Sequence, residues 1–131
     1  MSILPILENF FAENGKTDIL GFSYYPYWEK FESDRKVLSA KLREYAQKYG
    51  RPVMIAEECG LDHDEEGTYQ ILADCINAMG EQDGQEECGV FYWEPEVTAK
   101  ILPDAYPLGA AKLVGENTLQ YHKALRAYQE C

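Results

Sequence analysis

Apolar positions along the chain follow two spacings in turn, and the change of spacing predicts alternating helices and strands. Apolar residues three or four apart predict amphipathic helices over about 2–13, 34–49 and 69–80. Short continuous apolar runs predict buried strands over 18–23, 52–56 and 88–93. A last helix is expected over about 117–129, with Asn117 as its N-cap.

The order of these elements predicts the fold class. The strands begin near residues 18, 52 and 88, and each is followed by a helical segment. Continuous apolar strands that alternate with helices indicate parallel βα units with right-handed crossovers. We therefore expect one α/β domain over residues 1–131. A small open sheet and an arc of a (β/α)8 barrel both fit the pattern.

The charge balance excludes two classes of partner. The chain has 23 acidic and 12 basic residues and a formal net charge of -11, which disfavours binding to nucleic acid or to anionic membranes. No apolar run reaches the length of a membrane span, and no basic segment of a signal peptide precedes the first helix. The four cysteines have no CxxC spacing, so reduced thiols and disulfides both remain open.

The predicted strands end in residues that can carry chemistry. The first leads into the aromatic segment 24–28, the second into Glu57 and Glu58, and the third into Trp93 and Glu94. In parallel α/β folds, functional groups gather at these carboxyl ends. No strand is followed by a phosphate-binding glycine loop. The strand ends therefore favour a neutral, ring-shaped ligand over a nucleotide.

Glu57 has two interpretations. It can be a solvated carboxylate at a strand end, or a glycosidase carboxylate that works with a second acid across a cleft. Trp93 can belong to the core or rim, or serve as a platform for a sugar. Glu58 and Glu94 can be rim charges. The acidic loop around Asp62 and Asp64 is either solvated or a calcium ligand, although it lacks EF-hand spacing.

Three segments together resemble one enzyme family. The sequences DILGFSYYPYW (18–28), YGRPVMIAE (49–57) and GVFYWEP (89–95) are similar to the sixth, seventh and eighth strand segments of arabinogalactan endo-β-1,4-galactanases, glycoside hydrolase family 53. Their order and spacing agree with the family, and the resemblance covers most of residues 15–96.

The resemblance implies a fold, a reaction and a set of site residues. It implies three parallel βα units of a (β/α)8 barrel, with a preceding helix, from an enzyme that cleaves β-1,4-galactan with retention of configuration by two glutamates. Glu57 takes the position of the nucleophile. The implied substrate-binding residues are Tyr24, Tyr25, Trp28, Trp93 and Glu94. No cofactor is implied, apart from a structural calcium in bacterial members, which the loop near Asp62 and Asp64 does not clearly reproduce.

One departure from the family changes the functional expectation. The family's acid/base glutamate follows Gly-Asn, and no Gly-Asn-Glu occurs in this sequence. Glu58 is a poor substitute for that acid, because neighbours in a strand point to opposite faces. We expect this chain alone to be inactive and to need the missing barrel segment, or a second copy, to cover its open sheet edges. The alternative is a non-catalytic carbohydrate-binding or assembly module. The family is typically secreted, but localisation stays open.

Overall fold

The computed structural model describes residues 4–29, 31–82, 88–98 and 107–131. In chain order its elements are α1 (Leu4–Ala12), β1 (Leu20–Tyr24), α2 (Pro26–Glu29), α3 (Arg35–Tyr49), β2 (Val53–Glu58), α4 (Glu65–Gly80), β3 (Val90–Tyr92), β4 (Ala111–Val114), β5 (Thr118–Tyr121), the 3-10 helix η1 (Lys123–Arg126) and α5 (Ala127–Glu130).

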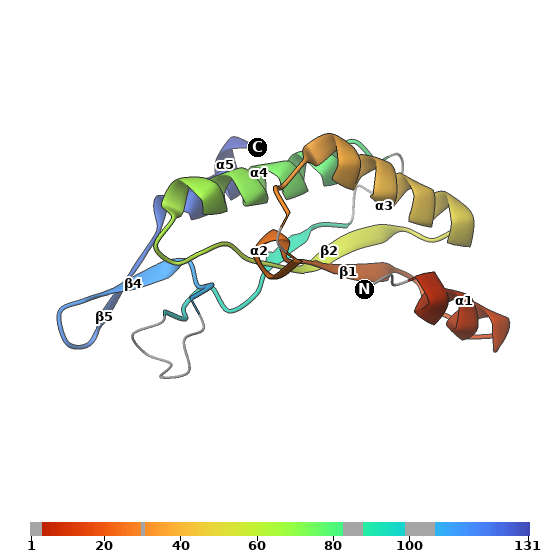
Figure 1. Ribbon diagram of the computed structural model, residues 1–131, viewed down its shortest axis with the longest axis horizontal. Helices are drawn as coiled ribbons and strands as arrows, with labels where there is room; N and C mark the ends of the chain where they lie inside the picture. Colours follow the sequence, from red (N-terminus) through yellow and green to blue (C-terminus); the bar gives the residue numbers. More distant parts are fainter. Residues whose placement is uncertain (1–3, 30, 83–87, 99–106) are drawn as a thin grey trace.

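The central element is a three-stranded parallel sheet with the order β1-β2-β3. Figure 1 shows α3 and α4 side by side over one face of this sheet. Each crossover from one strand to the next passes through one of these helices, as parallel pairing requires. The prediction of an α/β fold with three parallel strands is confirmed, and the arrangement is consistent with part of a βα barrel.

The core lies between the sheet and the two helices. Side chains of β1 and β2 on the covered face pack against apolar residues of α3 and α4. The buried members are Leu20, Phe22, Leu38, Leu42, Val53, Ile55, Cys75, Ala78 and Met79. The Phe22 ring stacks on Tyr45 with centroids 4.9 Å apart. This single-sided core leaves the opposite face of the sheet without a helical cover among the described residues.

Local caps set the helix boundaries close to those expected. The Asp34 side chain accepts from the backbone amides of Lys36 and Val37 at 2.8 and 3.1 Å, so α3 begins there. Gly50 ends α3 in the left-handed conformation, with φ +62°. In α4 the cap is Asp64, so this helix begins at Glu65, four residues earlier than the apolar spacing predicts.

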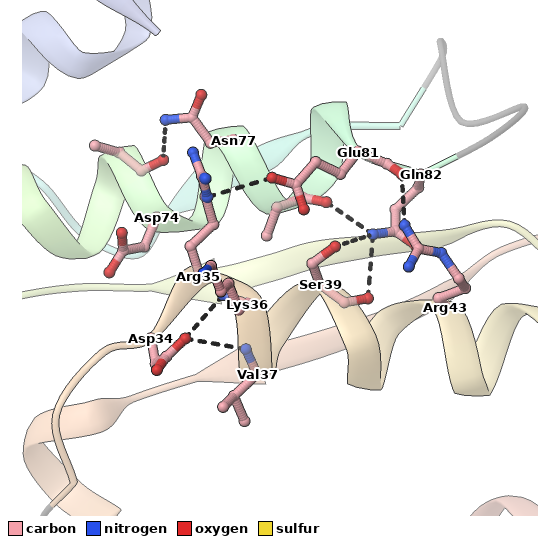
Figure 2. A network of polar contacts seen from close by, with 12 residues as sticks. Asp34, Arg35, Lys36, Val37, Ser39, Arg43, Asp74, Asn77, Glu81 and Gln82 are labelled. Atoms are coloured by element: carbon pink, nitrogen blue, oxygen red, sulfur yellow. Dashed lines mark hydrogen bonds and ion pairs between the residues drawn. The ribbon is translucent and has the colours of Figure 1, made fainter.

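Polar contacts fix α3 against α4, as Figure 2 shows. The amide of Gln82, just after α4, is buried and donates to Ser39 Oγ and to the Ser39 carbonyl at 3.1 and 3.2 Å. Arg35 pairs with Glu81 at 3.2 Å, and Arg43 donates to the Glu81 carbonyl at 3.0 Å. The buried amide contributes more than the exposed ion pair, because solvent screens exposed charges.

The prediction of a helix over 117–129 is wrong in its first part. The chain instead forms an antiparallel hairpin, β4 and β5, and only then η1 and the short α5. Gly115 adopts φ +72° in the turn, and Asn117 is a turn residue rather than a cap. The helical spacing of apolar residues near the end of the chain is produced by a strand followed by a helical turn.

Two further expectations concern the cysteines and the membrane. None of the four cysteines, all of which lie among the described residues, forms a disulfide, and Cys59 and Cys75 are buried like small apolar residues. Among the described helices, none combines the length and the apolarity needed to cross a bilayer.

Candidate active site

The order of burial along β2 inverts before the strand ends. Val53 and Ile55 are fully buried beneath the helices. Strict alternation would bury Glu57 next and turn Glu58 outward. The structure has the reverse order, because Glu58 is fully buried and Glu57 is partly exposed.

A β-bulge causes this inversion. Phe22 of β1 pairs with Ile55 of β2. The next residue of β1, Ser23, pairs with Glu57, so Ala56 is an extra residue in β2. A bulge of this kind re-aims the side chains that follow it. Glu57 therefore shares with Ser23 the sheet face that the helices leave uncovered.

The Glu57 carboxylate is held through one of its two oxygens. Ser23 Oγ and the Tyr25 hydroxyl each donate to Oε2 at 3.0 Å. Within the described part of the chain, Oε1 accepts no hydrogen bond. Hydrogen bonds to a charged acceptor are short and directional. The two donors thus orient the carboxylate and leave Oε1 available to an incoming group.

Tyr24 points to the covered side of the sheet, away from Glu57. Its hydroxyl donates to Ser33 Oγ at 3.4 Å, and Ser33 in turn donates to Asp74 of α4 at 2.7 Å. Its ring lies 5.6 Å from that of Phe31, and burial raises the pKa of its hydroxyl. Of the two tyrosines expected beside Glu57, the structure brings only Tyr25 into contact with it.

Trp93 and Glu94 follow β3 at the same end of the sheet. The backbone amide of Trp93 donates to the carbonyl of Glu58 at 2.9 Å, which fixes Trp93 beside the end of β2. Its side chain is 45% exposed. Glu94 is exposed and adopts φ +49°, a conformation that costs energy for a residue with a Cβ. Trp28 belongs to α2, but its side chain lies outside the described residues.

Glu58 is the most unusual carboxyl group of the site. It is fully buried on the covered face, and neither of its oxygens has a hydrogen-bond partner among the described residues. Burial raises its pKa from 4.5 to about 8, so this side chain is mainly uncharged at neutral pH. Glu58 therefore lies on the opposite face from Glu57 and cannot act beside it as a partner acid.

Two aspartates of the acidic loop accept hydrogen bonds from other described residues. Asp64 caps α4 by accepting from the Gly67 amide at 2.9 Å. Asp62 accepts from Thr98 Oγ1 at 3.3 Å and lies 3.2 Å from His63 Nδ1. In the ranges that the structure describes, no three His, Cys, Asp or Glu side chains are grouped so that they could hold a metal ion.

Sequence reasoning did not identify Ser23 as a site residue. The signal was present, because Ser23 and Tyr25 are two positions apart and so share one face of a strand, whereas Tyr24 faces the other way. The buried state of Glu58 had no comparable signal, since it follows from the bulge.

Comparisons with known proteins match the part of the chain that carries this carboxylate. The family "Glycosyl hydrolase family 53" matches residues 2–60, which include β1, β2 and Glu57. An uncharacterised protein from the 5' region of bgaB in Niallia circulans is 28% identical over 111 residues. That match covers 67% of this chain and 30% of the relative, so the chain spans about a third of the relative's length.

Proposed function

Because this chain is related to glycosyl hydrolase family 53, we propose that it carries the nucleophile side of a retaining glycosidase site for β-1,4-galactan. The proposed nucleophile is Glu57. The observation that carries the proposal is the fixed carboxylate, whose Oε2 accepts from Ser23 and Tyr25 while Oε1 accepts nothing within the described residues.

The proposed chemistry proceeds in two displacements. Glu57 Oε1 attacks the anomeric carbon as the bond to the leaving oxygen breaks and that oxygen takes a proton. Water then attacks the same carbon, gives up a proton, and releases the sugar from the Glu57 ester. The hydrogen bonds from Ser23 and Tyr25 to Oε2 orient the carboxylate for the first displacement and receive it again when the second displacement breaks the ester.

The proton donor of this reaction would come from outside residues 1–131. Retaining enzymes use a second carboxyl roughly 5–5.5 Å from the nucleophile. The sequence has no Gly-Asn-Glu segment, and Glu58 is buried on the far side of β2. We infer that cleavage of galactan needs an acid/base residue supplied by a further part of the barrel.

Trp93 and Glu94 are the proposed contacts to the sugar at the end of β3, together with Tyr25 and Trp28 near β1. The exposed indole of Trp93 offers an apolar face for a sugar ring. Glu94 offers a carboxylate that can accept from sugar hydroxyls. We propose that Tyr24 acts indirectly, since it supports the end of β1 through Ser33.

An activated substrate tests the nucleophile without the missing acid. Dinitrophenolate is a good leaving group, so dinitrophenyl β-galactobioside needs no protonation at that oxygen. We expect the full chain to release a burst of about one equivalent of dinitrophenolate, because a covalent intermediate accumulates. Glu57→Gln removes the burst, and the matched control Glu66→Gln, which changes an exposed carboxyl of α4, keeps it. The proposal is contradicted if the unaltered chain releases no more dinitrophenolate than the Glu57→Gln variant does.

Sugar binding without cleavage is the second candidate function, and the exposure of two aromatic side chains favours it. Phe91 is 57% exposed and Trp93 is 45% exposed at the end of β3. This function predicts a saturable change of tryptophan fluorescence on titration with β-1,4-galacto-oligosaccharides, which Trp93→Ala removes. A flat titration to millimolar sugar excludes it.

A further inference from the structure

A second pocket lies between the two loops that follow β1 and β2, against the first turns of α4. Its volume is about 380 Å³. Residues 26–27 and 31–33 line it from the first loop, Leu61 and Asp64 from the second, and residues 67–71 from α4. We call it the loop pocket. Pockets of roughly 300–1,000 Å³ are typical of sites for small ligands, so its size fits one or two sugar rings.

The buried carboxyl group of Asp74 holds the polar groups of the loop pocket in place. Its Oδ2 accepts from Ser33 Oγ at 2.7 Å, and its Oδ1 accepts from Gln70 Nε2 at 2.9 Å. Both donors line the pocket. Because they are already oriented, a ligand does not have to order them when it binds. Gln70 retains its Oε1 and a second N–H, and neither bonds to another side chain within the described ranges.

The remaining walls of the loop pocket favour a neutral sugar. Tyr27 and Phe31 line it and are 43% and 46% exposed, although both side chains are large and aromatic. Their rings offer apolar faces to a sugar ring. The charged side chains among the described lining residues are Glu32 and Asp64, and neither Lys nor Arg is among them. Two carboxylates disfavour an anionic ligand, whereas a neutral ring with hydroxyl groups matches the amide of Gln70.

The end of β1 separates the loop pocket from the candidate nucleophile. Tyr25 donates to Glu57 on the open face of the sheet. Its neighbour Tyr24 points to the covered side and donates to Ser33, which lines the pocket. A sugar in the loop pocket is therefore not the unit that Glu57 attacks. It belongs to a branch that leaves the main sugar chain near Tyr25 and passes over the end of β1.

We propose that the loop pocket binds a neutral branch sugar of the galactan chain, with its ring against Tyr27 and Phe31 and its hydroxyl groups bonded to Gln70. The pocket then makes branched galactan a better ligand than unbranched galactan. The assignment of the ligand as a branch of galactan rests on the proposed function. The binding of a neutral sugar rests on the pocket alone, so the two are tested separately.

Amide NMR of the full chain tests the pocket by itself. Titration with methyl β-galactoside is expected to shift the amides of Gly67 and Ile71 saturably, in the Glu57→Gln variant as well. The uronic acid analogue of this sugar is expected to bind more weakly by about fivefold or more. Gln70→Ala is expected to weaken the neutral sugar by about fivefold or more, because it removes hydrogen bonds to the hydroxyl groups. The matched control Gln47→Ala, at an exposed position of α3, is expected to change binding by less than about twofold.

Calorimetry with two tetraoses tests the branch. The ligands are β-1,4-galactotetraose and the same tetraose with one galactosyl branch. We expect the branch to increase affinity by about fivefold or more, and Gln70→Ala to reduce this gain to less than about twofold while Gln47→Ala preserves it. Three results overturn the proposal: no shifts at Gly67 and Ile71 with methyl β-galactoside, no difference between the two tetraoses, or a gain that survives Gln70→Ala. Sugar-dependent shifts in the loop pocket without a dinitrophenolate burst contradict the proposed function alone.

Discussion

Glu58→Gln tests the most specific electrostatic feature of the structure. The buried carboxyl of Glu58 has a pKa raised from 4.5 to about 8, because burial disfavours its charged form. Between these two pH values the folded chain keeps a proton that the unfolded chain releases. The free energy of unfolding therefore falls as pH rises from about 4.5 to about 8, and this contribution stays constant above pH 8.

The size of this loss of stability follows from the shift of the Glu58 pKa. At about 1.4 kcal/mol per pH unit, the Glu58 carboxyl lowers the stability by about 5 kcal/mol between pH 4.5 and 8, as an upper bound. A small domain has only about 5–15 kcal/mol of stability, so the effect is large. Glutamine has nearly the same shape as glutamate but no titrating proton. Glu58→Gln is therefore expected to remove the fall of the unfolding free energy with pH.

Urea unfolding followed by tryptophan fluorescence measures the effect from pH 5 to 9. We expect the stability difference between Glu58→Gln and the unaltered chain to increase by about 1.4 kcal/mol per pH unit up to pH 8. Glu58→Asp is the matched control, because it retains a buried carboxyl and should therefore retain the fall of the unfolding free energy with pH. Parallel stability curves for Glu58→Gln and the unaltered chain over pH 5 to 8 would refute the reasoning.

Two further pairs of variants test the site and the packing. Tyr25→Phe removes one of the two donors to the proposed nucleophile and is expected to slow the dinitrophenolate burst by about ten- to a hundredfold, whereas Tyr24→Phe changes it by less than about twofold. A burst that is slowed equally by both variants contradicts the assigned orientations. Gly109→Ala puts a Cβ against the Val97 carbonyl and is expected to cost more than about 2 kcal/mol in urea unfolding. At Gly80, at the end of α4, a Cβ meets open space, so Gly80→Ala is expected to be neutral or stabilising by up to about 1 kcal/mol. Equal effects of the two substitutions would exclude the close contact between Gly109 and the Val97 carbonyl.

The parallel sheet could be predicted from the sequence because its signals are local. Buried strands such as 53–58 read as continuous apolar runs, and α3 carries its own cap in Asp34 and its own stop in Gly50. The hairpin could not be predicted from apolar spacing, since the short strand β5 and the helical turn after it together imitate a helical repeat. The short helix α2 could not be predicted either, because four residues are too few to show a helical period.

The position of the candidate site could be predicted, but its orientation could not. The strand-end rule led to Glu57, Tyr25 and Trp93. The direction of Glu57, however, depends on a bulge that only pairing with β1 reveals. The same bulge buries Glu58, which the sequence indicated as a rim charge, and strand alternation removes Tyr24 from the carboxylate.

Mass spectrometry of the trapped intermediate tests the central claim most directly. A galactobioside with fluorine at the 2-position of the reacting sugar and a dinitrophenolate leaving group can form the glycosyl ester but releases it slowly. The account predicts that one fluorinated glycosyl group is attached to the chain and that fragmentation of the peptide locates it on Glu57. Attachment to another carboxylate, or equal labelling of the Glu57→Gln variant, would contradict it.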